Sequence, residues 1–374
     1  MVSLAADMVY EGARSVTGPL LAALGASALA VGLISGAGEA AALLLRLFSG
    51  PFADRTGRYW ALTIFGYAMT AVCVPLLAVA PLLGGAGLAV AAFLIVAERV
   101  GKAVRSPAKS ALLAEAAGAV GRGRGFAVHK ALDQIGAFAG PLLVAALVAA
   151  AGTVWPALAS LAIPGAVAMV LLVWLRRRFP APVRSSPATA VPDTGGLPRR
   201  FYWFAASAAA ATAGLVTFGL ISYHASSAGG ITLAAIPLLY AAAMAAEAIG
   251  ALVTGHVYDR SGARVLYALP VLAAATPALA LSGSVPAIIA GTMLWGVAVG
   301  VQDSTVKALV ADLVPGHRRA TAYGVFAAFQ GGAALVGGAL AGGLYGWSIT
   351  ALAVVVAVVQ LLSAALLAVT MRKN

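Results

Sequence analysis

Long stretches of this chain contain no charged side chain, and this limits the folds it can adopt. Residues 61–97 contain no Asp, Glu, Lys or Arg, and residues 201–246 contain none either. A membrane-spanning helix needs about 20 apolar residues, so each stretch is long enough for two spans joined by a short turn. Only 10% of all residues are charged and 62% are hydrophobic, whereas a soluble domain uses roughly 25% charged residues to face water. The chain is therefore predicted to be a multi-pass membrane protein whose outer surface faces lipid.

The residue types in these stretches favour helices over a β-barrel, because Ala, Leu and Gly dominate and strand-like alternation is missing. The first six spans are predicted near residues 2–25, 30–50, 58–82, 87–115, 125–150 and 154–176. The second six are predicted near residues 201–225, 230–256, 264–283, 286–312, 319–344 and 347–371. The predicted fold is an all-α membrane protein with twelve transmembrane helices in two pseudo-symmetric six-helix bundles. The bundles are expected to be residues 1–175 and 201–374, joined by a Pro-, Ser- and Arg-rich cytoplasmic linker over residues 176–200.

Lys and Arg are concentrated in alternate connecting segments of this predicted topology. Segments 84–87, 225–230 and 342–347 carry no charge, whereas the segments between them are basic. Because Lys and Arg of short loops stay in the cytoplasm, both chain ends are predicted to be cytoplasmic. These segments hold most of the positive charge behind the net charge of +12, so no nucleic-acid partner is predicted. Their basic residues are Arg55, Arg58, Lys109, Arg122, Arg124, Arg176, Arg177, Arg178, Arg184, Arg199, Arg200, Arg260, Arg264, Arg318, Arg319, Arg372 and Lys373.

Sequence features of enzymes and of secreted proteins are missing. Cys73 is the only cysteine, so disulfides and cysteine-based metal sites are excluded. No metal-ligand cluster, nucleophile elbow or nucleotide-binding motif occurs in the context that each requires. We therefore expect no enzymatic activity, no cofactor and no metal. Asp7, Glu11 and Arg14 interrupt the first apolar stretch, which argues against a cleavable signal peptide.

A short motif occurs at the same place in both halves. Gly50-Pro-Phe-Ala-Asp54-Arg55-Thr-Gly57-Arg58 follows the second predicted span, and a degraded copy at residues 255–262 follows the eighth. Residues 111–115 and 308–312, at the ends of the fourth and tenth spans, share an Ala-Leu-x-Ala-acid pattern. The first motif matches G-x-x-x-D-R-x-G-R, and the chain resembles the major facilitator superfamily along its whole length. The resemblance implies a cytoplasmic gate, in which charged pairs form and break as the halves rock, made by Gly50, Asp54, Arg55, Gly57, Arg58, Asp259 and Arg260.

Two further motifs carry the resemblance. Arg99, in the segment Glu98-Arg99-Val-Gly101-Lys102, is similar to the arginine of the family's fourth-helix motif. Gly136, Gly140 and Pro141 resemble a shortened form of the fifth-helix motif of exporters that exchange substrate for protons. Residues 99–107, followed by 124–126, resemble a bacterial subgroup of efflux proteins. The resemblance implies a secondary active transporter, with export favoured by the fifth-helix motif.

Seven acidic residues fall inside predicted spans: Asp7, Glu11, Glu39, Glu98, Asp133, Glu247 and Asp303. A charge at the bilayer centre costs at least about 2.5 kcal/mol, so such groups are usually paired or face a wet cavity. Asp7, Glu11 and Arg14 share one face of the first span. One interpretation is a structural ion pair between Glu11 and Arg14. The other is proton binding and release by a carboxyl group as its surroundings alternate, for which the candidates are Asp7, Glu11 and Asp133.

Other polar residues of the spans are candidates for lining the substrate cavity. Arg99 has a second interpretation as an ion-pair partner of Glu98, Asp133 or Asp7, and Asp303 has one as a partner of Lys307 four residues on. Cations left without a partner would favour an anionic or zwitterionic substrate. The candidate cavity residues are Arg14, Glu39, Arg99, Lys102, Arg105, Gln134, Asp303 and Lys307.

These features together predict a proton-coupled antiporter that exports a small organic, drug-like solute by alternating access. Three alternatives remain: a proton-coupled importer, an exporter of one anionic metabolite, and a lipid or glycolipid flippase. A membrane-embedded enzyme has no supporting motif. The expected partners are a small-molecule substrate and membrane lipids, and the expected state is a monomer.

Overall fold

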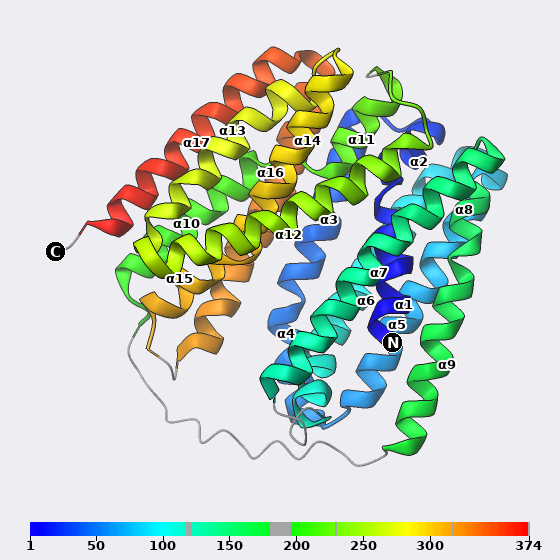
Figure 1. Ribbon diagram of the computed structural model, residues 1–374, viewed down its shortest axis with the longest axis horizontal. Helices are drawn as coiled ribbons and strands as arrows, with labels where there is room; N and C mark the ends of the chain where they lie inside the picture. Colours follow the sequence, from blue (N-terminus) through cyan, green and yellow to red (C-terminus); the bar gives the residue numbers. More distant parts are fainter. Residues whose placement is uncertain (117–121, 180–195, 229, 316–317, 373–374) are drawn as a thin grey trace. The chain divides into compact units, whose positions relative to one another are not determined.

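The computed structural model describes residues 1–116, 122–179, 196–228, 230–315 and 318–372. Within these ranges the regular secondary structure is helical, with no strand (Figure 1). This confirms the predicted all-α fold class. Residues 180–195 of the predicted linker, which include Arg184, lie outside the described residues, and so does Lys373.

Nine of the described helical segments are long and apolar enough to cross a membrane. Two of them, Tyr59–Leu113 and Ala235–Ala280, run for 55 and 46 residues. Since a span needs about 20 residues, each of these segments is long enough for two spans. The chain is thus a multi-pass membrane protein, and the count of twelve spans stays a prediction.

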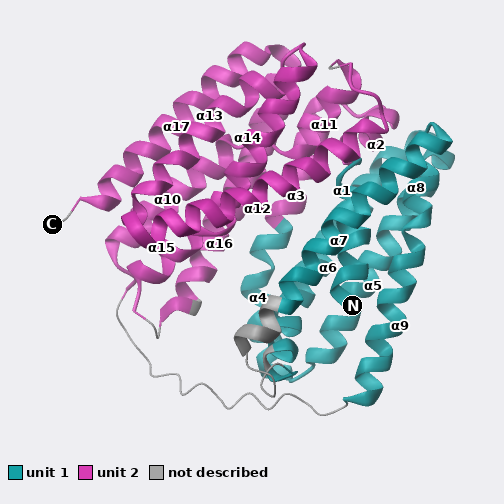
Figure 2. Cartoon of the chain, in the orientation of Figure 1, with its two compact units in different colours: residues 1–16, 41–195 teal, residues 17–40, 196–374 magenta. Residues whose placement is uncertain are grey.

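The chain divides into two units of close contact (Figure 2). Unit 1 consists of Met1–Val16 and Ala41–Gly195, and unit 2 of Thr17–Ala40 and Gly196–Asn374. This division follows contacts, whereas the predicted bundles at residues 1–175 and 201–374 follow the sequence repeat and stay a prediction. The helices of unit 1 are α1 (Val2–Arg14), α4 (Arg46–Thr56), α5 (Tyr59–Leu76), the 3₁₀ helix η1 (Leu77–Ala86), α6 (Gly87–Ala116), α7 (Arg122–Ala151), α8 (Trp155–Ser160) and α9 (Ala162–Arg178).

Unit 2 contains the helices of the second half together with a segment from the first. Helix α3 (Ala28–Leu44) crosses the boundary between the units near its end. Its first part packs closely on α16, because a Cβ on Gly32 would meet the backbone of Gly338. The other helices are α2 (Thr17–Ala23), α10 (Arg199–Gly214), α11 (Phe218–Ser227), α12 (Ala235–Ser261), the 3₁₀ helix η3 (Gly262–Tyr267), α13 (Ala268–Ala280), α14 (Val285–Asp303), α15 (Thr305–Leu313), α16 (Arg319–Trp347) and α17 (Ile349–Met371).

The first predicted span of each half, at residues 2–25 and 201–225, is interrupted within its length. The first break separates α1 from α2, where Pro19 has no N–H to donate to the carbonyl of Ser15. Ser15 Oγ also donates to the carbonyl of Gly12 at 2.6 Å, a local bond that competes with helix continuation. The second break lies between α10 and α11, where Leu215 is extended and Thr217 caps α11 by accepting from Leu220 N.

Glycines bring α1 and α7 into close contact inside unit 1. A Cβ on Gly136 would meet the backbone of Leu4, and one on Gly140 would meet the backbone of Met8 and Gly12. Gly136 lies against Leu4, and Gly140, one turn further along α7, lies against Met8, one turn further along α1. The two helices therefore run parallel. Small residues that let helix backbones approach are the common packing device of membrane helices. The residues that resemble the exporter motif therefore have a packing role in this fold.

Candidate functional site

Unit 1 buries an acid and a base that share one hydroxyl group. Glu98 and Arg105, both on α6, are 5% and 4% exposed. The Thr70 hydroxyl, from α5, donates to Glu98 Oε1 at 3.0 Å and accepts from Arg105 Nη1 at 2.6 Å. Buried charges are tolerated when they are paired and hydrogen-bonded. Thr70 thus holds two opposite charges in one buried group, although it carries no charge itself.

The ring of Tyr10 is the second centre of the site. Tyr10 is 3% exposed on α1, and Lys102 Nζ lies 3.5 Å from the centre of its ring. The guanidinium carbon of Arg99 lies 4.6 Å from the same centre. Arg14 Nη1 donates to the Tyr10 hydroxyl at 3.4 Å. Cations over an aromatic face are attracted by the electrons of the ring, and more strongly where water is excluded.

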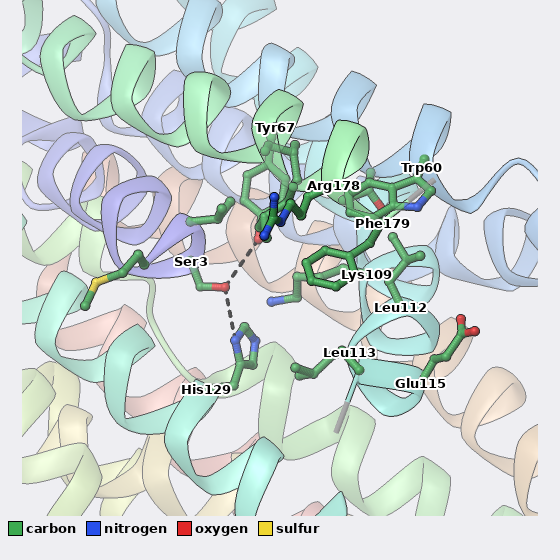
Figure 3. Close-up of a pocket in the computed structure, with 16 residues that line it drawn as sticks. Ser3, Trp60, Tyr67, Lys109, Leu112, Leu113, Glu115, His129, Arg178 and Phe179 are labelled. Atoms are coloured by element: carbon green, nitrogen blue, oxygen red, sulfur yellow. Dashed lines mark hydrogen bonds between the residues drawn. The ribbon is translucent and has the colours of Figure 1, made fainter. Parts of the chain in front are cut away.

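A chain of contacts joins this region to α7. The guanidinium of Arg105 lies over the ring of Tyr67, 4.4 Å from its centre. The Tyr67 hydroxyl is 3.4 Å from Ser3 Oγ, which is 3.1 Å from His129 Nδ1 (dashed lines in Figure 3). His129 Nε2 lies 3.4 Å from Asp133 Oδ2. We call this series of residues the polar chain; in order it comprises Glu98, Thr70, Arg105, Tyr67, Ser3, His129 and Asp133.

Asp133 ends the polar chain in an unusual environment. One carboxylate oxygen, Oδ2, faces His129. The other, Oδ1, is buried and has no hydrogen-bond partner among the residues that the structure describes. A buried acceptor without a partner costs about 1–3 kcal/mol, and more when it is charged. Asp133 therefore has one carboxylate oxygen that faces His129 and one whose capacity for a hydrogen bond is not met among the described residues.

The other predicted proton-coupling residues lie on α1. Asp7 and Glu11 are half-buried, as is Arg14. Arg14 contacts Tyr10, which joins this face of α1 to the cations of α6. Gln134, next to Asp133 on α7, is half-buried. The roles assigned to these residues stay predictions.

The second interpretation of Arg99 agrees with the structure, since its Nε lies 3.9 Å from Glu98 Oε2. Asp303 and Lys307, in unit 2, pair with each other at 3.0 Å and are both exposed. Glu39 is half-buried in the part of α3 that belongs to unit 2. The assignment of Arg99, Asp303, Lys307 and Glu39 to a substrate cavity stays a prediction.

Both copies of the loop motif place a glycine at positive φ, but the two turns differ. Gly57 has φ 63° and ψ 9°, the left-handed helical conformation, whereas Gly262 has φ 66° and ψ -158°. Glycine adopts positive φ without steric cost. In the first copy the Tyr59 hydroxyl donates to Asp54 Oδ1 at 2.9 Å. In the second, Tyr258, the neighbour of Asp259, donates to Asp312 at 2.6 Å. Gly50 is half-buried near Pro107, and the side chains of Arg55, Arg58 and Arg260 are exposed.

The uncharged residues of the site were not predicted, because the candidate residues were selected mainly by their charge. Ser3, Tyr10, Tyr67 and Thr70 supply the hydroxyls and rings that connect the charged groups. A signal was present for two of them. Ser3 and Tyr10 fall at helical spacing with Asp7 and Arg14, on the same face of α1.

Comparison with known proteins agrees with this fold. The family model described as Major Facilitator Superfamily matches residues 3–229 and 202–374. The uncharacterized proteins Rv2265 of Mycobacterium tuberculosis and Mb2288 of Mycobacterium bovis are 51% identical to the chain over 372 residues. Each match covers 97% of this chain and 89% of the relative.

Solved structures of transporters share the fold at low sequence identity. A mutant of the nucleoside transporter NupG has a TM-score of 0.79 at 14% identity, covering 99% of this chain and 98% of that one. A bacterial homologue of the iron transporter ferroportin, in an inward-facing state, has a TM-score of 0.71 at 14% identity, covering 99% and 97%. A bacterial homolog of the human lysosomal transporter Spinster, inward-facing and occupied, has 0.71 at 16%, covering 100% and 96%.

The helical architecture and these matches define the class as a multi-pass membrane transporter. The chain belongs to the Major Facilitator Superfamily, as its motifs predicted.

Proposed function

We propose that this transporter is a proton-coupled antiporter that exports a small organic solute across the bacterial cytoplasmic membrane. The observation that carries the proposal is Asp133, whose Oδ1 is buried without a hydrogen-bond partner while Oδ2 faces His129. A proton gradient supplies the energy, and no cofactor takes part. Both chain ends lie in the cytoplasm and the protein works as a monomer.

The polar chain connects Asp133 to the cations near Tyr10. It links α7 to α1, α5 and α6 through hydroxyls and the His129 imidazole, which can exchange donor and acceptor roles, and through the Tyr67 ring beneath Arg105. Protonation of Asp133 weakens its attraction to His129, and the altered contacts can pass through Ser3 and Tyr67 to Arg105. We infer that Asp7 and Glu11 tune this charge balance from α1.

The interrupted helices support alternating access. The first predicted span of each half is broken, into α1 and α2 and into α10 and α11. Such paired interruptions at corresponding positions are typical of the region where transporters hold their substrate. Inside unit 2, α2 packs tightly on α11, where a Cβ on Gly18 would meet Ser222, Tyr223 and Gly219. The proposed cycle closes this contact in one state and opens it in the other, while the exposed ends of α4 at Asp54 and of α12 at Asp259 do the reverse.

An alternative cargo is an anionic metabolite. It is favoured by the gathering of Arg14, Arg99 and Lys102 around one tyrosine ring, which would attract a negative group. The charge of the cargo therefore decides between the two versions of the proposal.

The test uses purified protein in liposomes with an imposed pH gradient and a trapped pH dye. A panel of cationic, neutral and anionic solutes is added to wild type, Asp133→Asn and Glu11→Gln. Lys130→Gln is the matched control, since Lys130 is an exposed residue of α7. We expect a solute-triggered outward movement of trapped protons in wild type and Lys130→Gln, lost in Asp133→Asn. Solute uptake together with inward protons would contradict export.

A further inference from the structure

A cavity of about 850 Å³ lies at the end of unit 1 where α1 and α5 begin and α6 and α9 end (Figure 3). Its volume falls in the range of about 300–1,000 Å³ that is usual for small-molecule sites. All of its walls come from unit 1. The basic residues Lys109 and Arg178 at these helix ends place the cavity at the predicted cytoplasmic side.

Most of the cavity wall is apolar. Val2, Leu112, Leu172 and Leu175 contribute aliphatic side chains. Phe179 also lines the cavity and is 61% exposed, so a large apolar group stands open at its mouth. Covering such surface with an aliphatic chain is favourable, at roughly 25 cal/mol per Å² of apolar surface removed from water. The wall therefore suits a hydrocarbon tail.

Two residues of the same wall, Trp60 and Thr63, carry buried polar atoms. Among the described residues, Thr63 Oγ1 and Trp60 Nε1 have no hydrogen-bond partner. The indole N–H can only donate, and the hydroxyl can donate or accept. Both atoms are closed to solvent, so they reach a ligand in the cavity only when their side chains turn towards it.

The charges of the wall favour an anion. Figure 3 shows Lys109, from α6, and Arg178, from α9, extending into the cavity. Glu115 lines the edge, with its carboxylate pointing away from these two groups. The N-terminal ends of α1 and α5 add partial positive charge from free backbone N–H groups.

We propose that this cavity binds a single-chain anionic amphiphile. The carboxylate or phosphate head pairs with Lys109 and Arg178, while the tail lies along the leucines and Phe179. The proposed binding does not depend on the proposed export of a solute, although the cavity wall and the polar chain share three residues. Only Ser3, Tyr67 and His129 belong to both the cavity wall and the polar chain.

Trp60 makes the site directly observable. The full chain is placed in nanodiscs of neutral lipid and titrated with a fatty acid brominated in its tail, because bromine quenches nearby indole fluorescence. The chain has six tryptophans, so we expect one saturable component of the quenching that is lost in Trp60→Phe and retained in Trp347→Phe, whose indole lies outside the cavity wall. A brominated alkyl phosphate of the same length distinguishes a phosphate from a carboxylate head, and binding of either supports the site.

Charge variants test whether Arg178 and Lys109 bind the head group or whether the apolar wall alone accounts for binding. Arg178→Gln should weaken binding about tenfold, the worth of one charged hydrogen bond. Arg177→Gln, a change in the exposed neighbour that does not line the cavity, should have no effect. Lys109→Gln should weaken binding similarly and Lys109→Arg should retain it, which guards against a folding defect. The proposal would be overturned if a brominated alkylammonium quenched as strongly as the fatty acid, or if Arg178→Gln and Arg177→Gln bound the fatty acid equally well. Quenching that does not depend on Trp60 would also overturn it.

Discussion

Unit 1 buries two charged side chains, Glu98 and Arg105, whereas unit 2 buries threonines, serines, glutamines and His224. In unit 2, His224 Nδ1 lies 2.8 Å from the Tyr345 hydroxyl and its Nε2 lies 2.8 Å from the Ser282 carbonyl. Gln360 Nε2 donates to the Ala211 carbonyl at 3.0 Å. Among the described residues, full burial of charge is confined to unit 1.

This contrast indicates where function is concentrated. Neutral hydrogen bonds are sufficient to pack the helices of unit 2. A buried ion pair adds little stability compared with apolar residues of similar size. Charges inside a membrane protein are costly and typically mark ion or substrate pathways. The charged interior of unit 1 is therefore better explained by transport than by folding.

Breaking the buried charge group should have the largest effect on stability. Arg105→Met leaves Glu98 buried beside Thr70 with the opposite charge removed. We expect a loss of about 3–5 kcal/mol in the free energy of unfolding, measured by titration of detergent-solubilised protein with a denaturing detergent. The double variant Glu98→Gln/Arg105→Met should recover most of that loss. Additive losses in the double variant would show that the two charges do not act as a pair.

Close packing by glycine, unlike burial of charge, should be equally important in both units. Gly140→Ala forces a Cβ against the backbone of Met8 and Gly12 in unit 1, and Gly338→Ala forces one against Gly32 in unit 2. Each should cost about 1–3 kcal/mol of unfolding free energy. Gly332→Ala is the control, because no heavy atom lies within 4 Å of its added Cβ. A loss confined to one unit would argue that packing, as well as charge, distinguishes them.

The tyrosine ring beside the α6 cations should contribute a smaller amount. Tyr10→Leu removes the ring near Lys102 and Arg99, and we expect a loss of about 1–2 kcal/mol. Tyr10→Phe keeps the ring and loses only the hydroxyl that accepts from Arg14, so its loss should be smaller. Equal losses in the two variants, measured by the same detergent titration, would assign the effect to the hydroxyl.

The smallest effect is expected from a buried amide of unit 2. Gln360 donates from Nε2, but its Oε1 is buried without a hydrogen-bond partner. Gln360→Met removes one hydrogen bond and one unsatisfied acceptor together, so the change in unfolding free energy should stay within about 1 kcal/mol. If Gln360→Met lowered the unfolding free energy as much as Arg105→Met, buried charges and buried neutral groups would not differ between the units.

Much of the fold was predictable from the sequence, because span length and apolar composition determine membrane helices. Predicted spans such as 87–115 and 319–344 match α6 and α16 to within a few residues. The breaks at Ser15 and Leu215 were not predicted, because they arise from one missing N–H and from local backbone geometry that hydrophobic patterns do not reveal.

Charge identified part of the site and missed the rest. Glu98, Arg105 and Asp133 stood out as polar groups in apolar surroundings. Thr70 and Tyr67 did not, because a threonine or tyrosine in a membrane helix is ordinary until a partner from another helix is known. The sequence does not show which helix faces meet, so the polar chain could be recognised only in the three-dimensional structure.

The most direct test of proton coupling at Asp133 asks whether Asp133→Asn still moves solute when it no longer uses the proton gradient. Once a transported solute is known, two rates are compared in liposomes: solute movement driven by a pH gradient, and solute exchange with no gradient. We predict that Asp133→Asn loses gradient-driven movement and keeps exchange, because the solute route is intact while the proton-binding group is gone. Gradient-driven movement at the wild-type rate would contradict the assignment of proton coupling to Asp133.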